Sequence, residues 1–229
     1  MLMCIRHPGA ASHRGHCAAC LLEEALAPTP PLAQPDGTIT IHVPLGRTVS
    51  SSVFLVRGDG PVVRLLRLKT WHAAAPEDFT ERFERLQRQL SEWHHEAIPV
   101  PLAASVDAAG RPSVLSEFHQ GVPIVDRVEA GGLAPAEAEA CLTRLLAATH
   151  DGHERGLVHG SIVSGNIIVA ARCTLAYLLD FGHAALVAPE GADAPTASDD
   201  YAGFDRLIRA VRTPASAGPH PSVTSCGFS

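Results

Sequence analysis

The strongest constraint on the fold is a change of hydrophobic period in the first half of the chain. Between Thr38 and Trp71, branched apolar residues alternate with polar ones, which is the period of a half-buried strand. Apolar residues then recur at steps of four and three, which places them on one face of a helix: Phe79, Phe83, Leu86, Leu90 and Trp93. The sequence therefore predicts an α+β domain with one helix inserted among antiparallel strands.

Turn signals divide the rest of the chain into elements. Strands are expected in TITIHVPLG, SSVFLV, VVRLLRLKTW, IPVPLAASVD and PSVLSEF, with a hairpin turn at Arg57–Gly60. Asp78 is the expected N-cap of the inserted helix, and Pro99 prevents its continuation. A second helix is expected in APAEAEACLTRLLAATHDGHERG, short strands around a loop after it, and a last helix near Asp200–Val211.

Composition and charge exclude several classes of protein. The 229 residues are 46% apolar, but no apolar run approaches the roughly 18 residues that cross a bilayer. Lys and Arg number 18 against 24 Asp and Glu, and this net charge of −6 argues against a nucleic-acid partner. The start of the chain lacks the pattern of a signal peptide, and the six cysteines do not form a disulfide framework. We therefore expect a cytoplasmic protein without a membrane segment.

Two short pairs of metal-ligand residues lie near the start of the chain. Cys4 and His7 form one pair and Cys17 and Cys20 the other, with nine residues between the pairs. Four sulfur and nitrogen ligands with this spacing suit a closed tetrahedral structural Zn²⁺ site. His13 or His16 could replace His7, and the alternative is a tail whose cysteines bind no metal.

The order of motifs along the chain resembles the protein-kinase fold, especially that of bacterial serine/threonine kinases. The similarity runs from about Leu45 to Val211, and each of its motifs is specific only in combination with the others. In order they are LGRTVSSSVFLV in place of the glycine-rich loop, Lys69 as the strand lysine, SEFHQG as the hinge, HGSIVSGN as the catalytic loop, Asp180-Phe181-Gly182 as DFG, Ala188-Pro189-Glu190 as APE, and ASDDYAGF with Asp199 as a buried helix anchor.

The resemblance implies a two-lobed fold and a division of the chain. A zinc-ribbon-like segment over residues 1–26 is similar to those found before some bacterial kinase domains, and a proline-rich linker follows over 27–37. The kinase-like domain is expected over 38–212, with an N-lobe at 38–121 and a truncated C-lobe at 122–212, before a disordered tail at 213–229. Leu90, His159 and Phe181 fall at apolar packing positions of that fold.

The catalytic loop has lost the groups that transfer phosphate in the family. Ser161 stands where the family has the catalytic Asp, and Val163 where it has a Lys that neutralises the phosphate. A serine hydroxyl cannot act as a general base near neutral pH, and such a loss typically costs about 10²–10⁴ in rate. Gly160 replaces the Arg of the motif, and only five residues, 183–187, separate DFG from APE.

The glycine-rich loop and the helix glutamate have also changed. Gly46 is the only glycine kept in LGRTVSSSVFLV, so close approach of the backbone to phosphates is expected to be poorer. Leu86 occupies the position of the helix Glu that pairs with the strand lysine, and Glu84 would need a shift of two residues to serve. Arg67, on the same strand face as Lys69, is expected to crowd the adenine pocket.

Other nucleotide-handling positions remain. The resemblance implies that Mg–ATP would be bound by Gly46, Lys69, Glu117, Phe118, Asn166 and Asp180, with Asn166 and Asp180 as magnesium ligands. The alternative is that Asn166 and Asp180 persist as loop-capping hydrogen bonders and Lys69 as a solvated strand residue.

These observations lead to one expected function and two alternatives. The expected function is a pseudokinase with residual Mg–ATP binding that acts as a scaffold or regulator for a protein partner in a signalling assembly. The first alternative is an active Ser/Thr kinase in which Asp180 serves an atypical mechanism. The second is an interaction module that binds no nucleotide.

Overall fold

The computed structural model describes residues 33–34, 37–58, 64–170 and 175–213. Their elements are β1 (Ala33–Gln34), β2 (Gly37–Arg47), β3 (Ser51–Gly58), β4 (Arg64–Trp71), α2 (Phe79–Trp93), β5 (Ala103–Val106), β6 (Pro112–Glu117), β7 (Gly121–Pro123), α3 (Ile124–Glu129), α4 (Pro135–Glu154), η1 (Ser164–Asn166), β8 (Ile167–Ala170), β9 (Ala176–Leu178), α5 (His183–Leu186) and α6 (Ala197–Arg212). They form two compact units, of which the first runs to Ala74 and resumes at Ala103–Phe118, and the second takes Ala75–Leu102 and the chain from His119.

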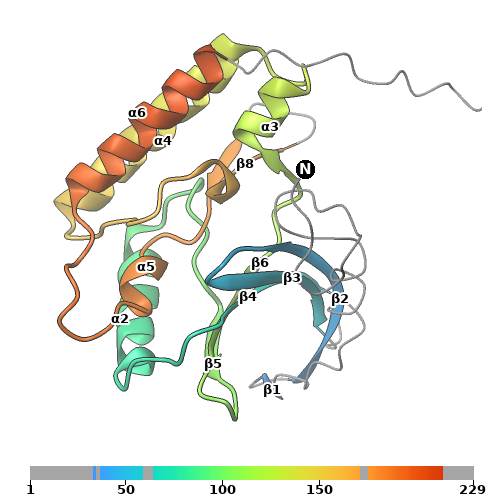
Figure 1. Ribbon diagram of the computed structural model, residues 1–229, viewed down its shortest axis with the longest axis vertical. Coiled ribbons are helices and arrows are strands. Elements are labelled where there is room, and N and C mark those ends of the chain that lie inside the picture. Colours follow the sequence, from blue (N-terminus) through green and yellow to red (C-terminus); the bar gives the residue numbers. More distant parts are fainter. Residues whose placement is uncertain (1–32, 35–36, 59–63, 171–174, 214–229) are drawn as a thin grey trace, which may run out of the picture. The chain divides into compact units, whose positions relative to one another are not determined.

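The first unit is one antiparallel sheet in the strand order β1-β2-β3-β4-β6-β5 (Figure 1). One face of it is apolar, because Val56, Leu66, Leu68 and Leu115 are buried together there. The expected strands are confirmed, and β3 pairs with β4 as the hairpin requires. Strand β5 is clearly shorter than expected: it begins only at Ala103, because the segment before it contains two prolines that cannot donate to a sheet.

Helix α2 begins and ends where the hydrophobic period predicts. Its apolar face is buried, and a left-handed His94 (φ 49°) ends it before Pro99 is reached. Asp78 occupies the N-cap position, but its carboxylate makes no capping bond. It instead accepts a hydrogen bond from Arg82 Nε at 2.7 Å, so the position of the residue is confirmed and its expected role is wrong.

Helix α2 belongs to the second unit, whereas the resemblance implies that it lies in the N-lobe with the sheet. Its polar side chains explain the grouping. Arg82 donates to the carbonyl oxygens of Ala185 and Ala188, and Trp93 Nε1 donates to Asp151 of α4 at 2.6 Å. These bonds connect α2 to the helical part of the chain.

The helical part of the second unit is built on α4 and α6, which lie side by side (Figure 1). Both are expected from the sequence, and Arg212 near the end of α6 forms a two-pronged ion pair with Glu139 of α4. Gly203 of α6 lies against Ile162, where a Cβ would come within 2.5 Å of the Ile162 side chain. Glycine at this position therefore allows α6 to approach the loop that contains Ile162.

A three-stranded sheet, β7-β8-β9, completes the second unit. The strands β8 and β9 fall within the region where the sequence predicts short strands, whereas β7 and α3 are not anticipated by it. Among the residues that the structure describes, no helix is both long and apolar enough to span a membrane.

Candidate functional site

A buried carboxylate of α6 holds the loop that resembles the catalytic loop. Asp200 is fully buried, and its two oxygens accept hydrogen bonds of 2.8 Å from the backbone N–H groups of His159 and Gly160. His153 Nε2 lies 2.9 Å from the same carboxylate. A buried carboxylate with three partners is well satisfied, and it fixes the start of the loop.

The anchor is therefore Asp200 and not Asp199, the residue expected from the resemblance. Asp199 is exposed, and its carboxylate caps the helix by accepting from the N–H and hydroxyl of Thr196 at 2.8 and 2.7 Å. Adjacent residues of a helix point about 100° apart, so only one of two neighbouring aspartates can face the loop. The position of each residue around the axis of α6 turns Asp200 towards the loop and Asp199 towards the solvent.

His159 fills the centre of the second unit as a neutral ring. Its Nε2 donates to the carbonyl of Leu179 at 2.9 Å, and its Nδ1 accepts from the N–H of Ser161. The ring packs edge-on against Phe181, with centroids 5.3 Å apart. Burial lowers the pKa of His159 to about 4, so the ring carries no charge near neutral pH. Leu90, His159 and Phe181 are all buried.

The loop presents no proton acceptor of suitable strength and no cation at the two substituted positions. Ser161 is exposed, and Val163 is 47% exposed although it is apolar. The loop sequence HGSIVSGN contains no Asp, Glu, Lys or Arg. Its backbone is held in place, but the side chains that would take a proton or neutralise a phosphate are absent from it.

Asn166 and Asp180 lie on adjoining segments. Asn166 Nδ2 donates to the carbonyl of Ser161 at 2.9 Å, and the N–H of Leu179 donates to the carbonyl of Asn166 at 2.8 Å. Asp180 has a left-handed backbone (φ 63°), a conformation that costs energy for a non-glycine residue and clusters at functional sites. Its Oδ1 lies 3.3 Å from Nδ1 of His183, a neighbour that the sequence does not predict.

These two residues could supply two oxygen ligands to a magnesium ion. The bond from Nδ2 fixes the amide of Asn166 and leaves Oδ1 as its acceptor, while Oδ1 of Asp180 lies beside His183. No group of three or more His, Cys, Asp or Glu side chains suited to a metal occurs in the described part of the chain. Mg²⁺ is commonly held by one or two carboxylates together with phosphate oxygens and water, so the pair fits an ion that arrives with a nucleotide.

In the first unit, Lys69 is half-buried and not a fully solvated residue. Its Nζ lies 5.1 Å from the centroid of the Trp71 ring, two residues along the same face of β4. Arg67 on that face is also buried, at 8% exposure. Trp71 is buried as well.

The turn between β2 and β3, in the place of the glycine-rich loop, is closed by its own side chains. Thr48 Oγ1 accepts from the backbone N–H groups of Ser50 and Ser51 at 3.3 and 3.0 Å. His72 bonds to the carbonyl oxygens of Val49 and Ser50 and so fixes the tip. Two N–H groups that could cradle a phosphate are therefore already used.

The remaining predicted residues are placed as follows. A Cβ on Gly46 would meet no atom within 4 Å, so nothing in the turn requires a glycine there. Glu117 is exposed at the end of β6, and Phe118 is half-buried as the last residue of the first unit. The proposed zinc ligands Cys4, His7, Cys17 and Cys20 lie outside the described residues, as do most of the linker and the tail.

Two known proteins are similar to the chain over most of its length. The serine/threonine-protein kinase pkn2 of Myxococcus xanthus is 30% identical over 161 residues, which cover 69% of this chain and 19% of the relative. The DNA damage-responsive serine/threonine-protein kinase RqkA of Deinococcus radiodurans is 32% identical over 151 residues, covering 62% of this chain and 21% of the relative.

These two similarities support a kinase-like family for the chain. It spans about a fifth of the length of these relatives, and no family model matches it. The mixed architecture with an antiparallel sheet is compatible with a kinase-like N-lobe.

Proposed function

We propose that the chain is a kinase-like domain that has lost efficient phosphoryl transfer and serves as a pseudokinase. One observation carries the proposal. Asp200 anchors the start of the loop His159–Asn166 through two hydrogen bonds, yet the loop presents Ser161 and Val163 to the solvent. A chain that needs only the fold can keep the Asp200 anchor without the catalytic side chains, whereas phosphoryl transfer requires both.

Weak binding of Mg–ATP is part of this proposal. Asp180 in its strained conformation and Asn166 with a fixed amide support it, because both orient oxygen atoms for a hard cation. The closed turn at Thr48 argues against tight nucleotide binding, because the amides of Ser50 and Ser51 already donate to Thr48. The expected affinity is therefore below that of a kinase with an open glycine-rich loop.

A thermal-shift titration with Mg–ATP tests the nucleotide part. Binding to the folded state raises the unfolding midpoint in proportion to the logarithm of the ligand concentration. We expect a small rise that Asp180→Asn abolishes, since Asn also tolerates the left-handed backbone but has no charge for the metal. Asp193→Asn, at an exposed position of the same segment, is the matched control and should respond like the unmodified protein.

A chain that shows no rise at any concentration would instead favour a second function, an interaction module that binds no nucleotide. The specific observation behind this candidate is the turn Thr48–Ser51, which satisfies its own amides. In either case the partner is a protein of a signalling assembly, and the setting is the cytoplasm.

The segment 1–26 completes the proposal as a structural zinc unit. Its four ligands, Cys4, His7, Cys17 and Cys20, leave no open position for catalysis. A unit of this size cannot bury enough apolar surface to fold alone, so metal would supply its folding energy. Its role would then be to present a rigid surface beside the kinase-like domain.

A further inference from the structure

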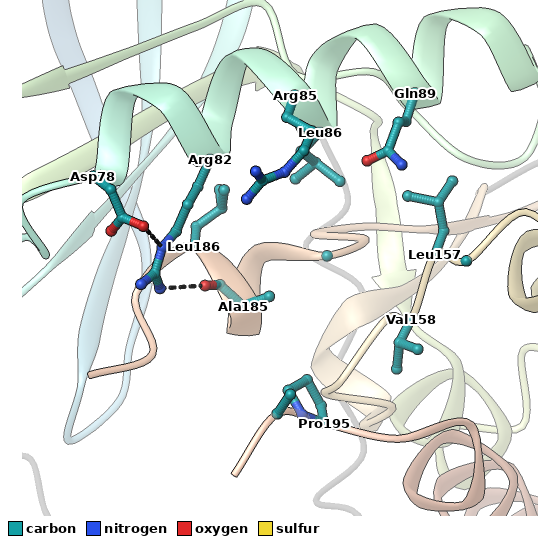
Figure 2. A pocket seen from close by; sticks show the side chains of 13 residues that line it. Asp78, Arg82, Arg85, Leu86, Gln89, Leu157, Val158, Ala185, Leu186 and Pro195 are labelled. Carbon is teal, nitrogen blue, oxygen red and sulfur yellow. Dashed lines mark hydrogen bonds and ion pairs between the residues drawn. The ribbon is translucent and has the colours of Figure 1, made fainter. Parts of the chain in front are cut away.

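A cavity of about 440 Å³ opens beneath α2 within the second unit. Figure 2 shows it between α2, the segment leading to His159, α5, and the stretch around Pro195. Neither Asn166 nor Asp180 lines it, although Gly182, two residues after Asp180, does. Its volume falls in the range of small-molecule sites.

The polar wall of the cavity has one cation that is not committed to another group. Arg82 is already used, because it donates to Asp78 and to the carbonyl oxygens of Ala185 and Ala188. The hydrogen bond from Arg82 lowers the pKa of Asp78, with a smaller contribution from the charge of Arg85, and the pair of Arg82 and Asp78 is neutral overall. Arg85, by contrast, makes no hydrogen bond or ion pair with any residue in the described part of the chain.

Arg85 and Gln89 extend from the same side of α2 into the cavity (Figure 2). They lie four residues apart, which places them one turn from each other along the helix. The guanidinium offers a planar fork of donors, and the amide adds a further donor and an acceptor. Together they form a polar edge with a net charge of plus one.

The rest of the lining is apolar. Leu86, Leu157 and Leu186 are at most 6% exposed, and Val158 and Pro195 are half-buried around them. Such surfaces attract a hydrocarbon group and repel a fully hydrated ion. A ligand must therefore combine one charged end with a compact apolar body.

We infer that this cavity binds a small organic carboxylate, with its carboxylate on Arg85 and its apolar part against Leu157 and Leu186. A carboxylate matches the guanidinium fork with two parallel hydrogen bonds. A single uncommitted cation balances a monoanion, whereas a phosphate monoester would keep an excess negative charge. The bound molecule would connect α2 to the segments before His159 and after Gly182, and this role goes beyond the proposed nucleotide binding.

Benzoate is the probe, with the full chain in a buffer of low ionic strength and no nucleotide present. Ligand-observed NMR titration should give saturable binding of benzoate and binding of neutral benzamide at least about tenfold weaker, because charged hydrogen bonds contribute more than neutral ones. Phenyl phosphate should bind no better than benzoate. Because ATP is omitted, the outcome is independent of the pseudokinase proposal.

Arg85→Gln provides the decisive variant, and Arg88→Gln on the same helix is its control. Both arginines are exposed, but only Arg85 lines the cavity, so both variants should remain folded. We expect Arg85→Gln to weaken benzoate binding about tenfold and Arg88→Gln to leave it unchanged. The inference is overturned if benzoate does not saturate, if benzamide binds equally well, if phenyl phosphate binds more tightly, or if the two variants behave alike.

Discussion

The buried carboxylate of Asp200 accepts a hydrogen bond of 2.8 Å from the backbone N–H of His159. This contact joins α6 to the loop that resembles a kinase catalytic loop, across 41 residues of sequence. The loop is therefore positioned by a helix and by its own backbone, and none of these hydrogen bonds involves the side chain of Ser161 or Val163. Loss of catalytic side chains can occur without loss of the fold.

The anchor makes a direct prediction for stability. Asp200→Asn removes the charge that three donors share inside the protein, and breaking such a buried network costs about 3 kcal/mol of unfolding free energy. Asp199→Asn alters an exposed cap and should cost much less. Urea unfolding of both variants measures the difference, and equal losses would contradict the assignment of Asp200.

The pair also shows what the sequence alone could not decide. Two adjacent aspartates carry the same local signal, and the choice depends on the phase at which α6 starts after its cap at Thr196. The strands and α2 could be predicted from the sequence because their apolar residues repeat. A shift of one residue in a strand would move its whole apolar set to the solvent face, so the repeat fixes which side chains are buried.

The second prediction concerns pH. In the unfolded chain a histidine titrates near 6.5, whereas burial lowers the pKa of native His159 to about 4. Between these values the unfolded state binds more protons, so stability is complete above about pH 6.5 and falls as the pH drops towards 4. From pH 7 to pH 5 this histidine should cost about 2 kcal/mol of unfolding free energy.

NMR titration of the imidazole ring checks this directly. His159 should stay neutral down to about pH 4, well below the value near 6.5 of an unperturbed imidazole. A His159 ring that titrated near 6.5 would contradict its buried, neutral state.

The third prediction concerns a double variant that introduces the base and the cation missing from the loop. Ser161→Asp and Val163→Lys, combined, place a base and a cation on a loop whose backbone is already anchored, and both positions are exposed enough to accept them. If their loss is what blocks transfer, autophosphorylation from radiolabelled ATP should rise by at least about a hundredfold. A double variant as inert as the unmodified chain would assign the block to the short segment after Gly182 instead.

The fourth prediction concerns the N-terminal segment. Protein purified without chelator should contain one equivalent of Zn²⁺, held by Cys4, His7, Cys17 and Cys20. Cys17→Ser should lose it, and Cys226→Ser, far from the cluster in sequence, should not. Elemental analysis that found less than about 0.2 equivalents in the unmodified protein would exclude a site of the usual tight affinity.

Other features depended on contacts that no local pattern encodes. The bond from Arg82 to Asp78 replaced the expected cap, because Arg82 lies one turn further along the helix and a charged pair formed. Closure of the β2–β3 turn required Thr48 and also His72, which follows the end of β4. No local pattern marks Arg85 as a binding residue, because only the fold places it at the edge of a cavity.

We propose that the loop anchored by Asp200 does not support efficient phosphoryl transfer. The turnover of the unmodified full chain with radiolabelled Mg–ATP and a general protein substrate measures this activity. We predict no transfer beyond a trace, because Ser161 and Val163 provide neither a base nor a charge. A turnover in the usual kinase range of about 1–100 s⁻¹ would show that the loop is catalytically competent and that the chain is not a pseudokinase.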